Sequence, residues 1–212
     1  MKALVIGATG AVGKDLVHQL LDDESFERVD IFVRREVDIP SSKLVLHVVD
    51  FDHPETWSDR LRGDVLFSCL GTTIRAAGSQ DAQWKVDYTY QLDAAKAARS
   101  NGVPTYVLVS SIGAHPQSKV FYTRMKGTLE EAVQDLGYDG CIILRPTSLI
   151  RKGSDRFGEK VGVAVLRVFN AVGLMRRLAP IPTEAVAAAM VRLAKRGPDG
   201  IEIISAQDIL KV

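Results

Sequence analysis

The sequence predicts an α/β fold, a doubly wound and mostly parallel sheet of about seven strands with helices on both faces. Three observations support this prediction. Short apolar runs alternate with longer stretches in which apolar residues recur at helical spacing. The runs are rich in Val, Ile and Leu, as strands buried on both faces are. The first run leads directly into a glycine-rich turn, as a strand that feeds a helix would.

The alternation gives the expected elements in chain order. Strands are predicted at residues 2–6, 29–33, 44–49, 64–69, 104–109, 140–144 and 201–204. Helices are predicted at residues 11–22, 54–61, 82–100, 119–137, 158–176 and 183–195. Because a helix or a long connection lies between successive strands, the strands are expected to run parallel.

The chain length favours one domain over residues 1–212, with a substrate-side insertion at about 147–182, where the strand rhythm breaks. No apolar run approaches the ~20 residues that cross a bilayer, so no membrane span is expected. The first apolar run, Ala3 to Ile6, is too short for the core of a signal peptide. These features predict a soluble protein of the cytoplasm.

Composition excludes other classes. Lysine and arginine number 27 against 26 acidic residues, and this balance argues against nucleic acid or an anionic membrane as the main partner. Cys69 and Cys141 lie inside apolar runs and are expected to be reduced core thiols. The histidines are scattered without the spacing of metal ligands, so no metal site is predicted.

The glycine-rich turn has the spacing G-x-x-G-x-x-G and joins the first strand to the first helix. Such a turn presents backbone N–H groups and the positive end of a helix dipole to a diphosphate. A tight turn without a ligand is the alternative, but the strand-turn-helix context favours a dinucleotide site. The predicted phosphate-binding residues are Gly7, Thr9, Gly10, Ala11, Val12 and Gly13.

Residues at the ends of later strands complete the predicted cofactor site. Arg34 and Arg35 end the second strand, where an arginine accommodates a 2′-phosphate, so NADP(H) is favoured over NAD(H). Both arginines could instead be solvated. Position alone places Asp50 and Phe51 near the adenine, and the segment Cys69-Leu70-Gly71 near a ribose.

A serine pair and a Tyr-x-x-x-Lys pair follow in order. Ser110 and Ser111 close the fifth predicted strand at the edge where open α/β sheets bind ligands. Tyr122 and Lys126 lie one helical turn apart. A nearby ammonium stabilises a phenolate, as a general acid or base for carbonyl and alcohol interconversion requires. A plain surface helix is the alternative.

Together these motifs resemble the short-chain dehydrogenase/reductase superfamily. GATGAVG, VSS, the Tyr-x-x-x-Lys pair and LRPTSLI are similar to motifs of its extended and atypical branches. FSCLGTT, SSIGA and YTRMKGTLEEAV are similar to the HIV Tat-interactive oxidoreductase-like subgroup. The resemblance runs from Met1 to about Ile150 and fades thereafter.

The resemblance implies a Rossmann-like fold, NADP(H) binding and roles for particular residues. Tyr122 would be the catalytic acid or base, Lys126 would bind the nicotinamide ribose, and Ser111 or Ser110 would orient the substrate. Arg145 and Pro146 match the Arg-Pro element after the sixth strand. In two respects the sequence departs from the family pattern. Cys69-Leu70-Gly71 replaces the usual Asn-x-Gly, and the active-site asparagine has no obvious counterpart.

The segment from Phe157 to Leu178 is apolar around most of its circumference. A helix over the cofactor cleft, a homodimer contact and a membrane-surface helix are all compatible with it. The basic residues Arg151, Lys152 and Arg156 just before it could attract an acidic substrate or simply be solvated.

Two functions from different classes follow. The first is an NADP(H)-dependent oxidoreductase or epimerase acting on an unidentified carbonyl, alcohol or sugar-nucleotide-like small molecule. The second is a regulatory protein that senses NADP(H) and binds a partner with little turnover. A Rossmann-like domain without a cofactor is the third reading.

Overall fold

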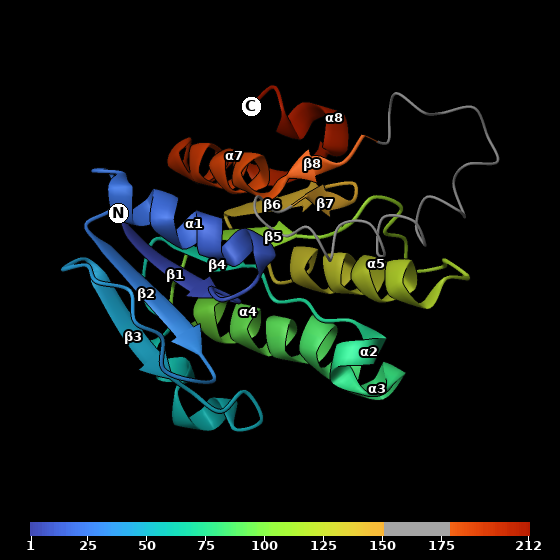
Figure 1. Cartoon of the computed structure of the whole chain (residues 1–212), viewed down its shortest axis with the longest axis horizontal. Coiled ribbons are helices and arrows are strands. Elements are labelled where there is room, and N and C mark those ends of the chain that lie inside the picture. The colour runs from blue at the N-terminus through green and yellow to red at the C-terminus, as the bar shows by residue number, and fades with distance from the viewer. Residues whose placement is uncertain (151–178) are drawn as a thin grey trace.

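A computed structural model describes residues 1–150 and 179–212 of the chain (Figure 1). Its centre is a sheet of seven parallel strands in the order β3-β2-β1-β4-β5-β6-β9. The strands are β1 (Lys2–Ile6), β2 (Arg28–Val33), β3 (Leu44–Val48), β4 (Val65–Ser68), β5 (Thr105–Val109), β6 (Gly140–Arg145) and β9 (Gly200–Ser205). The predicted doubly wound, Rossmann-like sheet is therefore confirmed.

Helices cover both faces of this sheet (Figure 1). α1 (Ala11–Asp22) and α7 (Thr183–Lys195) pack side by side on one face. α4 (Tyr90–Ser100) and α5 (Phe121–Gln134) cover the other. No helix of the described segments has both the length and the apolar character needed to cross a membrane.

Successive side chains of a strand point to opposite faces of the sheet, so each strand contributes to the apolar cores on both faces. In β1, Ala3 and Val5 are buried toward α1 and α7, whereas Leu4 and Ile6 are buried on the side of α4 and α5. Apolar residues on both sides make β1 a fully buried central strand. The order of the strands reverses beside it, since the chain goes from β3 at one edge to β4 on the far side of β1. Open α/β sheets bind their ligands at such a switch point.

The prediction of a helix at residues 54–61 is wrong. Two 3₁₀ helices, Pro54–Thr56 and Ser58–Arg60, occupy this segment. Trp57 separates them because its backbone leaves helical geometry, with φ −144° and ψ −15°. Its indole is buried, and Nε1 donates to the Asp50 carbonyl at 2.8 Å. Burial of this ring outweighs the local preference for a continuous helix.

The helix predicted at 82–100 exists but is not uniform. It consists of α3 (Gln80–Trp84), a π-helical turn at Lys85–Thr89, and α4. A π turn widens the winding and changes which side chains face the sheet beyond it, and such turns are frequent at functional sites. Here the turn buries the charged residue Asp87.

The remaining elements are short. α2 (Ile74–Ala77) precedes α3, and α8 (Ala206–Ile209) follows the last strand. A two-stranded parallel pair, β7 (Leu149–Ile150) with β8 (Ile181–Pro182), was not predicted. The helix predicted at 158–176, the three basic residues near it and most of the expected insertion lie outside the described residues.

Candidate cofactor cleft and catalytic residues

The glycine loop has the close contacts that its spacing predicts. Gly7 follows β1 directly with φ +80°, a conformation that other residues rarely adopt, and its carbonyl accepts the Gly10 N–H at 2.9 Å. A Cβ on Gly7 would lie 2.4 Å from the Cys69 carbonyl carbon. A Cβ on Gly13 would lie 2.1 Å from the Gly7 carbonyl oxygen. Only glycine permits this approach of strand, loop and helix.

A cleft of about 380 Å³ opens over this loop, within the size range of small-molecule sites. Its walls come from the carboxyl ends of β1, β2 and β4, from the loop after β3, and from the segment of α2, α3 and the π turn. The predicted residues that line it are Gly7, Thr9, Gly10, Arg34, Phe51, Cys69, Leu70 and Gly71. The bare backbone of the loop and the N-terminus of α1 fit a diphosphate, and Arg34 lies in the same cleft.

The other predicted residues do not line this cleft. They are Ala11, Val12, Gly13, Arg35, Asp50, Ser110, Ser111, Tyr122, Lys126, Arg145 and Pro146. Val12 and Gly13 are buried where α1 packs on the sheet, because the apolar side of α1 faces the core. Arg35 is exposed. The Asp50 carboxylate accepts the Asp52 N–H at 2.9 Å and so belongs to its own turn.

One wall of the cleft, at Phe51, Lys85 and Tyr90, is aromatic and charged. The Phe51 and Tyr90 rings lie 5.5 Å apart between centroids. Asp52 accepts a short hydrogen bond from the Tyr90 hydroxyl and forms an ion pair with Lys85 Nζ at 2.6 Å. These two interactions lower the pKa of Asp52. The Lys85 and Tyr90 side chains both line the cleft, although the sequence analysis singled out neither.

Cys69 lies at the floor of the cleft, where its backbone contacts Gly7. Burial raises the pKa of its thiol to about 12, against the opposing effect of Lys126. The group therefore stays a neutral thiol at physiological pH, as expected for a reduced core cysteine, and is no nucleophile.

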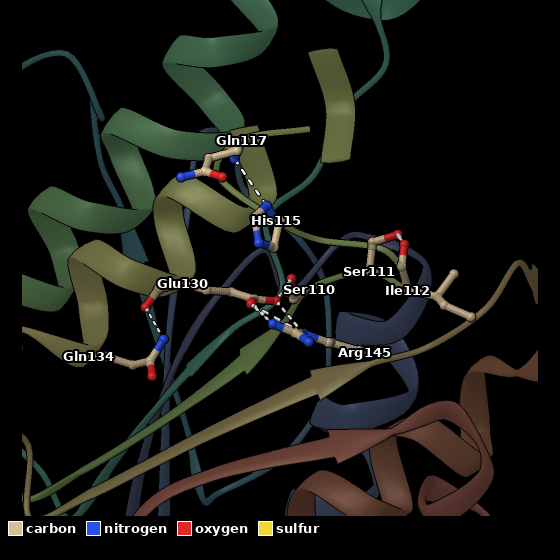
Figure 2. A network of polar contacts seen from close by, with 8 residues as sticks. All are labelled: Ser110, Ser111, Ile112, His115, Gln117, Glu130, Gln134 and Arg145. Carbon is tan, nitrogen blue, oxygen red and sulfur yellow. Dashed lines mark hydrogen bonds and ion pairs between the residues drawn. The ribbon is translucent and has the colours of Figure 1, made fainter. Parts of the chain in front are cut away.

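Ser110 is held in a polar network with Glu130 and Arg145 (Figure 2). The Ser110 hydroxyl donates a short hydrogen bond to Glu130 Oε1. Arg145 reaches the same carboxylate through Nε at 3.1 Å and through its terminal nitrogen at 2.5 Å. This bidentate pair raises the pKa of the Arg145 guanidinium. The network joins the ends of β5 and β6 to α5. Ser110 and Arg145 both bind the Glu130 carboxylate.

Ser111 has different surroundings from its neighbour. It is half-buried, and its hydroxyl makes a long bond of 3.3 Å to the Ile112 carbonyl (Figure 2). The backbone beside it is fixed, because the Ile112 N–H donates to the Pro146 carbonyl at 2.9 Å. Pro146 therefore supports the serine loop through its main chain. Of the two serines, Ser111 has the hydroxyl more available to a ligand.

Tyr122 and Lys126 lie one turn apart on α5, as predicted, but differ in exposure. The tyrosine is 37% exposed near the start of α5, whereas Lys126 is only 2% exposed. Lys126 Nζ lies 3.5 Å from the carboxylate of Asp87. That carboxylate accepts the N–H of Thr72, a residue of the cleft wall, at 2.8 Å. Lys126 is thus connected to the cleft through one side chain.

Sequence reasoning missed several residues around the site. Asp87 and Glu130 are buried acids that hold Lys126 and Arg145, and Lys85 and Tyr90 line the cleft. Gly127 lets the His115 backbone lie against α5, since a Cβ there would be 2.3 Å from the His115 carbonyl carbon. A charged residue on the apolar side of a predicted helix was the available signal for both acids. A glycine inside a predicted helix was the signal for Gly127.

Comparisons with known proteins agree with this geometry. The family model described as NAD(P)H-binding matches residues 7–196. The protein FMP52, mitochondrial, of Saccharomyces cerevisiae is 35% identical over 100% of this chain and 96% of its own length. Its namesake in Candida albicans is 31% identical over 100% of this chain and 98% of its own.

Solved structures share the fold at low sequence identity. The oxidoreductase ylbE from Lactococcus lactis has a TM-score of 0.72 and 19% identity, covering 100% of this chain and 95% of that one. A UDP-galactose 4-epimerase has a TM-score of 0.72 and 16% identity, covering 97% and 76%. These likenesses show the fold that the resemblance to short-chain dehydrogenases implies. The narrower likeness to the HIV Tat-interactive subgroup stays a prediction.

The prediction of a cytoplasmic location is wrong, because the relatives are named as mitochondrial proteins. That prediction depended on the lack of an apolar signal-peptide core, which mitochondrial import does not use. The glycine loop, the cleft at the switch point and the matched residues lead to one conclusion: the chain is a member of the NAD(P)H-binding family that includes the fungal FMP52 proteins.

Proposed function

We propose that the chain is an NADP(H)-dependent oxidoreductase of the atypical short-chain dehydrogenase/reductase type. Its substrate would be a small carbonyl, alcohol or sugar-nucleotide-like molecule. The observation that carries this proposal is the link from the cleft wall at Thr72 through Asp87 to Lys126. This link supports a single site, because it connects the wall of the cleft above the glycine loop with the helix that carries the Tyr-x-x-x-Lys pair. The names of the relatives also support a mitochondrial location.

Each residue has a defined task in this proposal. The N–H groups after Gly7 and Gly10 bind the diphosphate, and Arg34 binds the 2′-phosphate. When bound, NADP(H) supplies or accepts a hydride. Tyr122 gives a proton to the substrate oxygen or takes one from it, and its partial exposure leaves the phenol accessible to a substrate. Lys126 binds the nicotinamide ribose, as the resemblance to short-chain dehydrogenases implies.

One experiment with two arms tests the proposal. In the binding arm, Arg34→Ala is expected to weaken NADPH about ten-fold and to leave NADH affinity unchanged, because a charge-assisted bond to the 2′-phosphate is lost. Fluorescence titration measures both. Arg35→Ala is the matched control, since Arg35 is exposed and does not line the cleft. An unchanged preference for NADPH in Arg34→Ala would assign Arg34 to solvent.

In the turnover arm, wild type and Tyr122→Phe are compared for NADPH oxidation across a panel of carbonyl compounds. Loss of the proton-transfer group should lower kcat about 1,000-fold while the affinity for NADPH stays the same. Undiminished activity in Tyr122→Phe would remove the tyrosine from the mechanism.

A second function is an NADP(H) sensor that binds a partner with little turnover. One observation favours it: none of Ser111, Tyr122 and Lys126 is among the described residues that line the cleft. Failure of the wild type to oxidise NADPH on any compound of the panel, together with a partner whose affinity changes with NADPH, would select this function.

A further inference from the structure

A buried ion pair lies behind the wall of the cleft. Asp87 is 1% exposed and Lys126 is 2% exposed, and Nζ lies 3.5 Å from Oδ1. Burial of one charge without the other is strongly unfavourable, because neither group has water to solvate it. The two side chains come from different elements, the π turn before α4 and the middle of α5. Each therefore depends on the other to be buried in charged form.

Asp87 is anchored by more than this pair. Its Oδ2 accepts the Thr72 N–H at 2.8 Å, and a Cβ added to Gly71 would lie 3.7 Å from its Oδ1. Its main-chain carbonyl accepts Nε2 of Gln91 at 2.6 Å. The carboxylate is thus fixed directly behind two residues of the cleft wall.

The other titratable groups near Lys126 offer it no counter-charge. Glu130, one turn later on α5, is held by Arg145 and Ser110. The thiol of Cys69, which lies toward Lys126 from the end of β4, stays neutral because burial raises its pKa to about 12. Among the described acidic side chains, Asp87 is the one paired with Nζ.

We propose that Asp87 is a positioning residue, the counter-ion that keeps Lys126 charged and holds its ammonium behind the cleft wall. The inference rests on the proposed function and adds to it the group that sets the charge of the lysine. Burial raises the pKa of Asp87, and the ammonium and the Thr72 N–H oppose that shift. Each member of the pair is therefore stabilised in its charged form by the other.

The test is a pH titration of Lys126 by NMR, with lysines labelled at Cε and the Lys126→Met variant used for assignment. In Asp87→Asn the ammonium is expected to lose its proton at least one pH unit lower than in the wild type. Asp87→Glu should restore the wild-type titration. Asp93→Asn, the same exchange at a half-buried position of α4, is the matched control.

Turnover and NADPH affinity are measured in the same variants. Turnover and NADPH affinity of Asp87→Asn should match the wild type at pH 6 and fall at least ten-fold below it at pH 9. A merely structural role would lower both by the same factor at every pH. If Asp87→Asn does not fold, the titration of Lys126 is compared instead between Asp87→Glu and the wild type at high salt. A difference below half a pH unit between their titration midpoints supports the pairing.

The outcomes separate the two proposals. Unchanged titration of Lys126 in Asp87→Asn would overturn the counter-ion role, whatever the activity. A shifted titration with pH-dependent loss of NADPH affinity, in a wild type that oxidises no compound of the panel, would support the counter-ion role and remove the oxidoreductase.

Discussion

Ser110 and Ser111 are adjacent in the sequence but have different surroundings. Ser110 is buried, and its hydroxyl donates to Glu130, which also binds Arg145. Ser111 is half-buried with a weakly engaged hydroxyl. A strand places successive side chains on opposite sides, and the same alternation at the end of β5 separates these two residues. Ser110 is engaged in holding the fold together, and Ser111 is the serine that we propose for the substrate.

This difference predicts opposite effects for two alanine variants. Ser110→Ala should lower the free energy of unfolding by about 2 kcal/mol, because a hydrogen bond to a buried carboxylate is lost. Ser111→Ala should change stability by less than about 0.5 kcal/mol and lower kcat about 100-fold. Urea denaturation and the carbonyl panel measure the two effects. Reversed effects would make Ser110 the substrate-binding serine.

At the scale of elements, α5 depends on a glycine in its interior. Gly127 faces the backbone of the loop that follows Ser111, and a Cβ there would be 2.3 Å from the His115 carbonyl carbon. Alanine favours a helix interior over glycine by about 1 kcal/mol. A clash with main-chain atoms cannot be relieved by turning a side chain, so the loop or the helix must move. The clash is therefore expected to outweigh the propensity.

Gly127→Ala should lower the free energy of unfolding by up to about 2 kcal/mol, after the gain in propensity is subtracted from the overpacking. The displaced loop should also lower turnover, because it carries Ser111. Thr128→Ala, the next position of α5, is the control, since its hydroxyl donates within the helix, to the Arg124 carbonyl. A Gly127→Ala protein more stable than wild type would mean that the loop moves freely.

At the scale of the whole molecule, the α1 and α7 face is closed by a contact between distant parts of the chain. Lys195 Nζ lies 2.7 Å from Asp23 Oδ2, and the Ser25 N–H donates to Asp23 Oδ1 at 2.8 Å. Together they lower the pKa of Asp23 to about 2. A carboxylate whose pKa is lowered by folding stabilises the fold above its unfolded pKa of about 3.8.

Asp23→Asn is therefore expected to be less stable than wild type at pH 6, by no more than about 1 kcal/mol because the pair is near solvent. The difference should shrink as pH falls from about 4 through the folded pKa of about 2, and vanish only below it, where both proteins carry a neutral group. Thermal melts across this range provide the measurement. A difference that is constant with pH would exclude the ionised carboxylate as its cause.

The sequence predicted the sheet and the glycine loop because their signals are local. Each strand is an apolar run, and Gly7, Gly10 and Gly13 follow one of them directly. The partners of the charged residues were not predictable, because they depend on which elements meet in space. Asp87 meets Lys126 only through the π turn, whose extra residue no propensity reveals. Ser110 likewise meets Glu130 and Arg145 only after β5, α5 and β6 are packed together.

The π turn at Lys85–Thr89 makes the geometry of the site depend on the number of residues in this segment. Deleting a single amino acid there would restore ordinary winding and rotate the preceding residues by about 100° relative to those that follow. Asp87 would then no longer sit beneath Thr72, although every helix would remain. Loops elsewhere tolerate gaps in evolution, but a gap of one codon here would disconnect the cleft from α5 without unfolding the protein.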